Sequence, residues 1–224
     1  MTTHAASARL GRPWCGVLAG PLFVAVVSAL GARRPGYDPR RHLISSLAAG
    51  ERGWPQRTNF VVAGLAYLIA ARGLRRAGHG IASPVVSGLV GAAGVGLVGS
   101  GLFVTDPACG FPAEAARDAV RGSAGGPGRN TRAGTLHNLS AIPVFVGIPL
   151  AALVSAVSSA RRGRPAWAGY SAASGLIMVG GFLAMGRAIA KGPPGQRRSG
   201  VLQRLSVVSG LGWLSALSWR ATRS

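Results

Sequence analysis

The sequence predicts an all-α membrane protein, built as a bundle of six transmembrane helices with a polar cap formed by loops 1, 3 and 5. Two features of the composition point to this class. Hydrophobic residues make up 48% of the 224 residues and charged residues only 13%, whereas a soluble domain has about 25% charged residues. Glycine, which is common in membrane helices, occurs 35 times. The same composition argues against a disordered chain, a collagen and a disulfide-built secreted module.

Six apolar segments account for the bundle, because a spanning helix needs about 20 largely apolar residues. In chain order they are residues 14–32, 58–71, 81–105, 138–160, 165–186 and 205–219. The second segment is short, and we expect Arg57 and Arg72 at its ends to extend to the membrane surface. The sixth reaches full length only if it begins at Val201, which places Gln203 and Arg204 in its first turn.

Two of the segments carry packing signals. The third has a small residue at every fourth position, namely Gly88, Ala92, Gly96 and Ser100. Such a row lets another helix approach closely, and we expect that helix to belong to the same chain, with a homodimer face as the alternative. In the fourth segment, Pro143 and Pro149 are expected to bend the helix.

The predicted organisation is a tail over residues 1–13, one transmembrane domain over residues 14–219 and a tail over residues 220–224. Arg9 and Arg12 precede the first span as they would a signal peptide, but its apolar run is long for one, and we expect a retained span. All five acidic residues lie in loops 1 and 3, and the short even-numbered loops carry only positive charge. Because positive residues in short loops favour the inside, we expect both termini in the cytoplasm and the protein in the cell membrane.

The net charge of +20 is a reason to consider nucleic-acid binding. We exclude nucleic acid as a partner because the arginines lie in clusters between apolar segments. The sequence also has no helix-turn-helix, zinc-finger or RNP pattern. Basic clusters beside membrane spans favour anionic lipid, so membrane lipids are the expected partners.

The first and third loops each contain an Asp-Pro pair. Asp38-Pro39 is a strong helix start, so we expect a short helix from Asp38 to about Ala49 that lies at the membrane interface. Asp106-Pro107 closes the third span, and we expect a short helix over residues 112–120 and a flexible stretch over residues 123–129 to follow it.

Seven polar residues of these loops and of the following helix starts are expected to converge at one membrane surface: Asp38, His42, Ser45, Asp106, His137, Gln203 and Arg204. In a catalytic interpretation, Ser45 is a nucleophile, His137 its base and Asp106 the acid that orients the base, which would make the protein an intramembrane lipid hydrolase. In a structural interpretation, Asp38 and Asp106 cap helices and Arg204 forms an ion pair with Asp106.

The sequence favours a non-enzymatic protein that binds lipid head groups or a partner at its polar cap, because no catalytic motif has diagnostic spacing. The lipid hydrolase is the alternative. A small-solute transporter is a third hypothesis, disfavoured because the spans contain no ionisable relay and no internal repeat. Neither a metal nor a cofactor is expected.

The same segments resemble a family of six-span bacterial membrane proteins known as domain of unknown function 998. The resemblance covers nearly the whole chain and rests on these positions: Asp38, Ile44-Ser45-Ser46-Leu47, Asn59-Phe60, Phe103 to Pro107, His137-Asn138 and Gln203-Arg204. It implies the six-span architecture and a polar cluster that includes Asn59. Relatives often carry an acidic residue in place of His42 or Ser46, so the resemblance assigns no role to His42. It implies no reaction.

Overall fold

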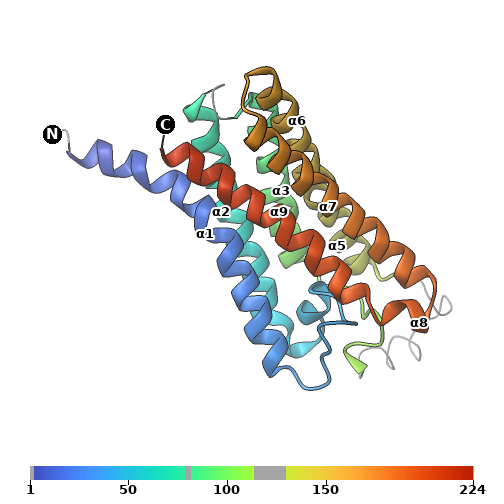
Figure 1. Cartoon of the computed structure of the whole chain (residues 1–224). Helices are drawn as coiled ribbons and strands as arrows, with labels where there is room; N and C mark the ends of the chain where they lie inside the picture. The colour runs from blue at the N-terminus through green and yellow to red at the C-terminus, as the bar shows by residue number, and fades with distance from the viewer. Residues whose placement is uncertain (1–2, 79–81, 114–129, 224) are drawn as a thin grey trace.

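A computed structural model describes residues 3–78, 82–113 and 130–223. The expected short helix after Pro112 and the stretch over residues 123–129 lie almost entirely outside these residues. The described chain is all-α, which confirms the predicted class (Figure 1). Its elements, in order, are α1 (Thr3–Arg33), η1 (Ser45–Ala48), η2 (Glu51–Gly53), α2 (Trp54–Ala77), α3 (Pro84–Leu102), α5 (Arg132–Ile142), η3 (Pro143–Gly147), α6 (Ile148–Arg161), α7 (Pro165–Ala190), α8 (Pro193–Gln196) and α9 (Ser199–Thr222).

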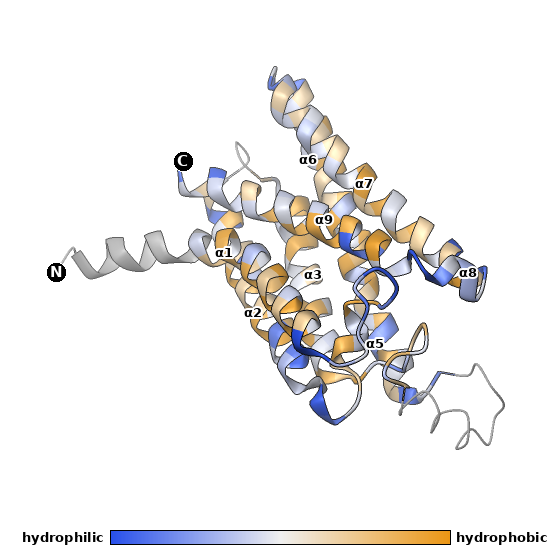
Figure 2. Ribbon diagram, turned by 60° about the horizontal axis from the view of Figure 1, so that its bottom comes forward, coloured by the Kyte–Doolittle hydropathy of each residue, from blue (hydrophilic) through white to orange (hydrophobic). Residues whose placement is uncertain are grey.

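Four stretches of helix are long and apolar enough to cross a membrane. They are Trp14–Arg33, Pro84–Leu102, Arg132–Arg161 and Pro165–Ala190. Helices α2 and α9 are also long, at 24 residues each, but they are not among these four. Hydrophobic residues are concentrated in the helices, while hydrophilic residues are frequent in the segments that join them (Figure 2). The length and composition of the four stretches are those of an integral membrane protein.

The long helices pack in a closed ring. Around it, α1 contacts α2, α2 contacts α3, and α3 contacts the continuous unit of α5, η3 and α6. Helix α6 then contacts α7, α7 contacts α9, and α9 returns to α1. The largest fully buried side chains include Trp213, Tyr67 and Ile148. The chain ends lie at one end of the ring, and the first loop and α8 lie at the other, which we call the loop end (Figure 1).

The fourth predicted span is one continuous helical unit with a widened turn in its middle. Residues Pro143–Gly147 form a π-helical turn, η3, that joins α5 to α6. Proline has no N–H to donate and its ring clashes with the carbonyl one turn earlier, and a wider turn is one way to accommodate it. The predicted disturbance at Pro143 therefore takes the form of a π turn, and the helix does not end there.

The row of small residues on α3 divides between two environments. At Gly96, an added Cβ would lie 2.5 Å from the carbonyl oxygen of Ser140, and Ser100 is buried, so this half faces α5 as expected. Gly88 and Ala92 are exposed, so the expectation is wrong for them. An α-helix turns about 100° per residue, so a row of every fourth residue drifts by about 40° per step, and its two ends face different neighbours.

Other glycines allow a close approach of α2 to α3. An added Cβ at Gly94 would lie 2.9 Å from the carbonyl oxygen of Gly64, and one at Gly64 would lie 2.6 Å from the carbonyl oxygen of Gly94. The two backbones therefore touch where neither carries a side chain, as membrane helices often do. Serines add hydrogen bonds on the opposite side of the ring, where Ser206 of α9 donates to the carbonyl oxygen of Met178 at 2.7 Å.

The expected interfacial helix between Asp38 and Ala49 is not formed, which corrects the prediction. Asp38 Oδ1 accepts a hydrogen bond from the backbone N–H of Arg40 at 2.8 Å, a pattern typical of a turn. The chain then makes the short 3₁₀ turn η1 and folds in beneath the ring, where residues 42–44 and 46–49 are buried. The apolar residues of this loop thus pack on the helices, which leaves the loop end less polar than expected.

Candidate functional site: a central cavity

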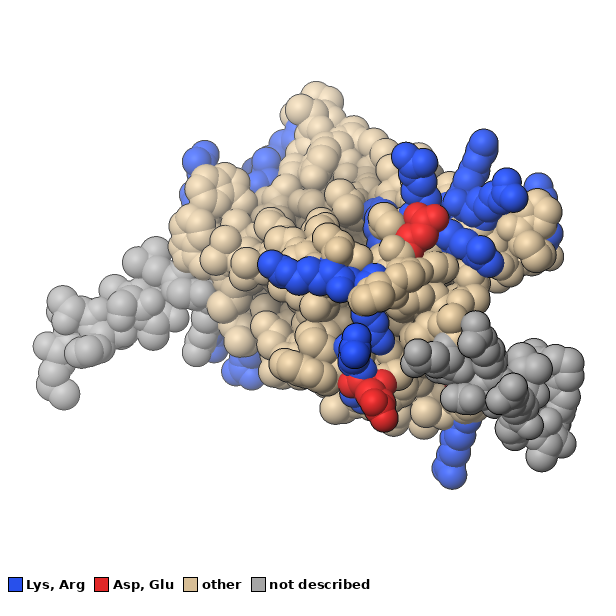
Figure 3. Space-filling view, turned by 90° about the horizontal axis from the view of Figure 1, so that it is seen from below, with Lys and Arg blue, Asp and Glu red and all other residues tan. Residues whose placement is uncertain are grey.

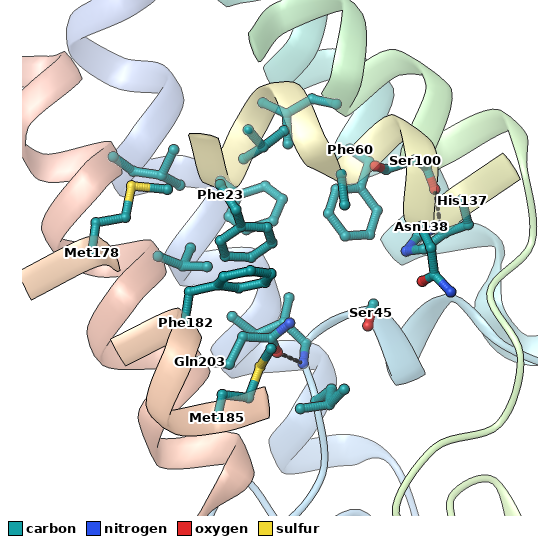
Figure 4. A pocket seen from close by; sticks show the side chains of 18 of the residues that line it. Phe23, Ser45, Phe60, Ser100, His137, Asn138, Met178, Phe182, Met185 and Gln203 are labelled. Carbon is teal, nitrogen blue, oxygen red and sulfur yellow. Dashed lines mark hydrogen bonds between the residues drawn. The ribbon is translucent and has the colours of Figure 1, made fainter. Parts of the chain in front are cut away.

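The ring encloses a cavity of about 320 Å³ close to the loop end (Figure 4). This volume is at the lower end of the range for small-molecule sites, roughly 300–1,000 Å³. All six long helical units and the first loop contribute to its lining. Large apolar side chains dominate the walls, including Phe23, Phe60, Phe145, Met178, Phe182 and Met185. Five polar side chains also line it: Ser45, Ser100, His137, Asn138 and Gln203.

His137 is held by the end of α3. Its Nδ1 lies 3.0 Å from the carbonyl oxygen of Ser100 and 3.0 Å from that of Phe103. The last carbonyls of a helix have no intrahelical partner. The imidazole therefore supplies a hydrogen-bond donor to carbonyl oxygens at the end of α3. Carbonyl oxygens only accept hydrogen bonds. Nδ1 therefore carries the proton, and in the neutral ring Nε2 is an acceptor.

Gln203 joins α9 to the first loop. Its Oε1 accepts a hydrogen bond from the backbone N–H of Ile44 at 2.6 Å (Figure 4). Gln203 is only 6% exposed. This hydrogen bond allows its burial, because a buried amide needs hydrogen-bond partners. With Oε1 engaged, the Nε2 amide is the group of Gln203 that remains to donate.

Ser45 and Asn138 supply the polar groups with spare hydrogen-bonding capacity. Ser45 follows directly on the anchored Ile44 and is half-buried, and Asn138 follows His137 on α5 and is exposed. Figure 4 shows both side chains on the side of the cavity where His137 lies. Among the residues that the structure describes, neither side chain has a hydrogen-bond partner, so both can serve a bound molecule.

One wall of the cavity depends on side chains rather than on packed helices. Helix α7 packs on α6 and α9, whereas α5 packs on α3. Between η3 and α7 the rings of Phe145 and Phe182 stack with centroids 4.4 Å apart. This aromatic pair forms part of the cavity wall.

Asp106 belongs to the start of α5. Its Oδ2 accepts from the backbone N–H of Thr131 at 2.8 Å, and its Oδ1 accepts from the Thr131 hydroxyl at 2.7 Å. The Thr131 oxygen in turn accepts from the backbone N–H of Gly134 at 3.0 Å, which caps the helix. Within the described ranges, no hydrogen bond joins Asp106 to His137 or His137 to Ser45. Backbone carbonyls, not Asp106, orient the imidazole.

Arg204 is occupied by the first loop, so the expected ion pair with Asp106 is wrong. Its guanidinium donates to the carbonyl oxygens of Pro39 at 2.6 Å, His42 at 3.1 Å and Gly200 at 3.0 Å, and to the hydroxyl of Tyr37. The turn at Asp38 leaves the carbonyls of Pro39 and His42 without helical partners, and the five N–H groups of arginine suit several acceptors at once. The first loop therefore takes the place predicted for the third.

His42 and Tyr37 form a second cluster, below the cavity. The His42 ring stacks on Phe111 with centroids 5.0 Å apart, and its Nδ1 accepts from the backbone N–H of Asp38 at 2.9 Å. Burial lowers the pKa of His42, and the charge of Arg41 lowers it further. Burial also raises the pKa of Tyr37. Asp38 and His42 thus hold the first loop and do not line the cavity.

Asn59 also has a structural position. Its amide donates to the carbonyl oxygen of Phe23 at 3.2 Å and to Oε1 of Gln56 at 3.3 Å, which links α2 to α1. The structure therefore brings Ser45, His137 and Gln203 together at the cavity. It separates them from Asp38, His42, Asn59, Asp106 and Arg204, which hold loops and helices.

Sequence reasoning missed the apolar walls. The signal that could have found one of them is on α7, where Met178, Phe182, Met185 and Ile189 recur at intervals of four, three and four residues. All four line the cavity. Such spacing marks one face of a helix, but it does not say whether that face meets protein, lipid or a cavity.

Comparison with known proteins places the whole site within one family. Residues 17–220 match the family described as "Protein of unknown function (DUF998)". No curated protein and no solved structure matches the chain. The matched range runs from α1 to α9 and includes every residue that lines the cavity. The chain therefore belongs to the DUF998 family, as the resemblance at Asp38, His137-Asn138 and Gln203-Arg204 implied.

Proposed function

We propose that this protein is a six-span membrane protein that binds an amphiphilic lipid in its central cavity. One observation carries the proposal. All the long helices contribute apolar side chains to a single cavity, and hydrogen-bonding groups of Ser45, His137 and Gln203 lie at its lining near the loop end. A chain of methylene groups suits the walls, and a head group suits the polar side chains, as in other ligand sites with few polar groups.

Six spans follow from the ring if α2 and α9 cross the membrane with their neighbours. Each of them packs between two helices of the ring. On α2, Arg57 lies in the first turns and Arg75 and Arg76 in the last, so these side chains can extend to the membrane surface. On α9, Arg204 is satisfied by backbone carbonyls and Arg220 lies in the last turn.

We place both termini in the cytoplasm of a cell whose surface membrane holds the protein. The two chain ends lie at the same end of the ring as the turn between α6 and α7, which contains Arg161, Arg162 and Arg164 (Figure 1). Short basic turns favour the cytoplasmic side. At the opposite, loop end, basic side chains stand at several separate places on the surface (Figure 3). We therefore propose that these basic side chains contact anionic lipids of the surrounding membrane, and not nucleic acid.

The binding proposal can be tested by filling the cavity. Ala141 of α5 lines it, whereas Leu139 on the same helix is 55% exposed. We expect Ala141→Phe to reduce photolabelling of the α7 wall by diazirine-bearing single-chain lipids, because the added ring occupies the binding volume. Leu139→Phe is the matched control and should label as the unchanged protein does. Full-length protein in phosphatidylcholine nanodiscs and peptide mapping by mass spectrometry supply the readout, and equal labelling of the two variants would refute the proposal.

Hydrolysis of a lipid is a second candidate because Ser45 and His137 line the same cavity. To act as nucleophile and base, their side chains would have to approach within about 3 Å. A fluorophosphonate probe distinguishes the two functions. Simple binding predicts no covalent labelling that depends on Ser45, whereas a hydrolase predicts labelling that Ser45→Ala abolishes.

A further inference from the structure

We infer that the cavity takes an uncharged single-chain lipid whose head group carries a hydroxyl, in preference to a fatty acid or a phospholipid. This inference rests on the proposed lipid-binding function and names the class of ligand. Three properties of the lining carry it: the absence of charge, the kind of hydrogen-bonding groups that remain unused, and the volume.

Among the residues that the structure describes, those that line the cavity include no arginine, lysine, aspartate or glutamate. The cation closest in sequence is Arg204, whose guanidinium is bound to the first loop through Pro39, His42 and Tyr37. A carboxylate or phosphate moved from water into this space would lose its hydration without meeting a cation, which is strongly unfavourable. A hydroxyl loses much less.

The unused polar groups include both an acceptor and donors. His137 offers Nε2 as an acceptor because Nδ1 is engaged with the carbonyl oxygens of Ser100 and Phe103. Gln203 offers its amide N–H groups because Oε1 accepts from Ile44. A hydroxyl can both donate and accept, whereas a carboxylate only accepts and would leave the imidazole nitrogen without a partner. The lining therefore matches an alcohol better than an acid.

The volume limits the ligand to one chain. A cavity of about 320 Å³ lies at the lower end of the range for small-molecule sites, roughly 300–1,000 Å³. A single alkyl chain can place its first methylene groups there and leave the rest among the membrane lipids. The two chains of a phospholipid exceed this space.

Photolabelling with matched probes tests the inference. The probes are hexadecanol and hexadecanoic acid that carry the same diazirine at the same carbon atom, each incubated with the full-length protein in phosphatidylcholine nanodiscs at pH 7.5. We expect the alcohol to label the α7 wall, Met178 to Ile189, about tenfold more than the acid does, a ratio equivalent to a tenfold difference in affinity.

Two variants sharpen the test. In His137→Asn, the amide can still donate to the carbonyl oxygens of Ser100 and Phe103 but has no counterpart of Nε2, so labelling by the alcohol should fall about fivefold. In Asn138→Arg, an exposed residue at the lining becomes a cation, so labelling by the acid should rise about fivefold. Asn138 has no hydrogen bond to lose among the described residues, so this second variant remains informative if the first does not fold.

The outcomes separate this inference from the function on which it rests. Labelling of the α7 wall by the acid at least as strong as that by the alcohol would overturn the inference and leave lipid binding intact. Unchanged alcohol labelling in a folded His137→Asn variant would also overturn it. Labelling by neither probe would overturn both.

Discussion

His137 illustrates how one side chain can serve the fold and the site together. Nδ1 satisfies two carbonyl oxygens at the end of α3, and the ring packs edge-on against Phe60 with centroids 6.1 Å apart. The ring is thereby fixed in one tautomer and one orientation, which leaves Nε2 for the cavity. Polar groups held this firmly bind a ligand without first having to be ordered.

At the residue scale, His42 predicts how stability depends on pH. Burial lowers its pKa in the folded protein below the ordinary value of 6.5, and its Nδ1 accepts a hydrogen bond that protonation would remove. The unfolded chain therefore binds the proton more readily, so the stabilisation is present above pH 6.5 and is lost as the pH falls through the pKa of the folded state.

We expect the melting temperature of the detergent-purified protein to decrease as the pH is lowered from 7.5 to 5. His42→Phe keeps a ring to stack on Phe111 and has no proton to bind. Its melting temperature should be lower at pH 7.5 and should change less over this range. An equally steep decrease in the variant would assign the pH dependence to other groups.

Arg204 and Asp106 give a second prediction at this scale. The two side chains have separate partners, the first loop for Arg204 and Thr131 for Asp106. Removal of a charged hydrogen-bond donor costs about 1.5–3 kcal/mol, so Arg204→Gln should destabilise the protein. Because the sites share no contact, the effects of Arg204→Gln and Asp106→Asn should add within about 0.5 kcal/mol. A coupling of 1 kcal/mol or more in a double-mutant cycle would instead indicate a direct ion pair between the two side chains.

At the scale of the elements, α3 is defined by its glycines. The helix meets α2 through Gly94 and α5 through Gly96, and its Gly88 has open space around it. The three glycines have the same backbone type and differ only in what an added side chain would meet. Helix α3 therefore offers its own matched controls.

We predict that Gly96→Leu lowers the free energy of unfolding by about 1–3 kcal/mol, because its Cβ would clash with the carbonyl oxygen of Ser140. Gly88→Leu should have little effect or stabilise slightly, since both changes share the same gain in helix propensity. Denaturation of the two purified variants in detergent measures the difference. Equal stability of the two variants would place Gly96 away from α5.

The elements that the sequence predicts well are those that depend on local composition. Four of the six apolar segments lie in stretches of helix long and apolar enough to cross a membrane, since about 20 apolar residues leave few other structures open to a membrane chain. The second and sixth segments lie in α2 and α9. The first loop was predicted wrongly because Asp38-Pro39 starts helices and turns alike. The choice depends on Gln203, which is 159 residues away from Ile44 in sequence.

The site was predictable only in part for the same reason. Ser45, His137 and Gln203 stand out as polar residues at the ends of apolar segments, and all three line the cavity. The partners of Arg204 are backbone carbonyls, which have no sequence signature. The cavity itself needs side chains from six helical units and one loop, and no single segment reveals how they meet.

At the scale of the whole molecule, orientation is the next prediction. Both chain ends and the basic α6–α7 turn share one end of the ring. A reporter fused after Arg164 should therefore behave as cytoplasmic, and one inserted at Gly126 as external, because the positive charge of short loops favours the inside. The activities of paired reporters at the two positions measure the orientation. The reverse pair of signals would show that the protein has the opposite orientation in the membrane.

The central claim concerns the cavity inside the ring of helices, where we propose that a lipid binds. Native mass spectrometry of the full-length protein, released gently from the membrane in which it is expressed, tests this most directly. The account predicts a population that retains one single-chain lipid, that this lipid is lost in Ala141→Phe, and that Leu139→Phe keeps it. A protein that carries no such lipid, or that retains it equally in both variants, would contradict the account.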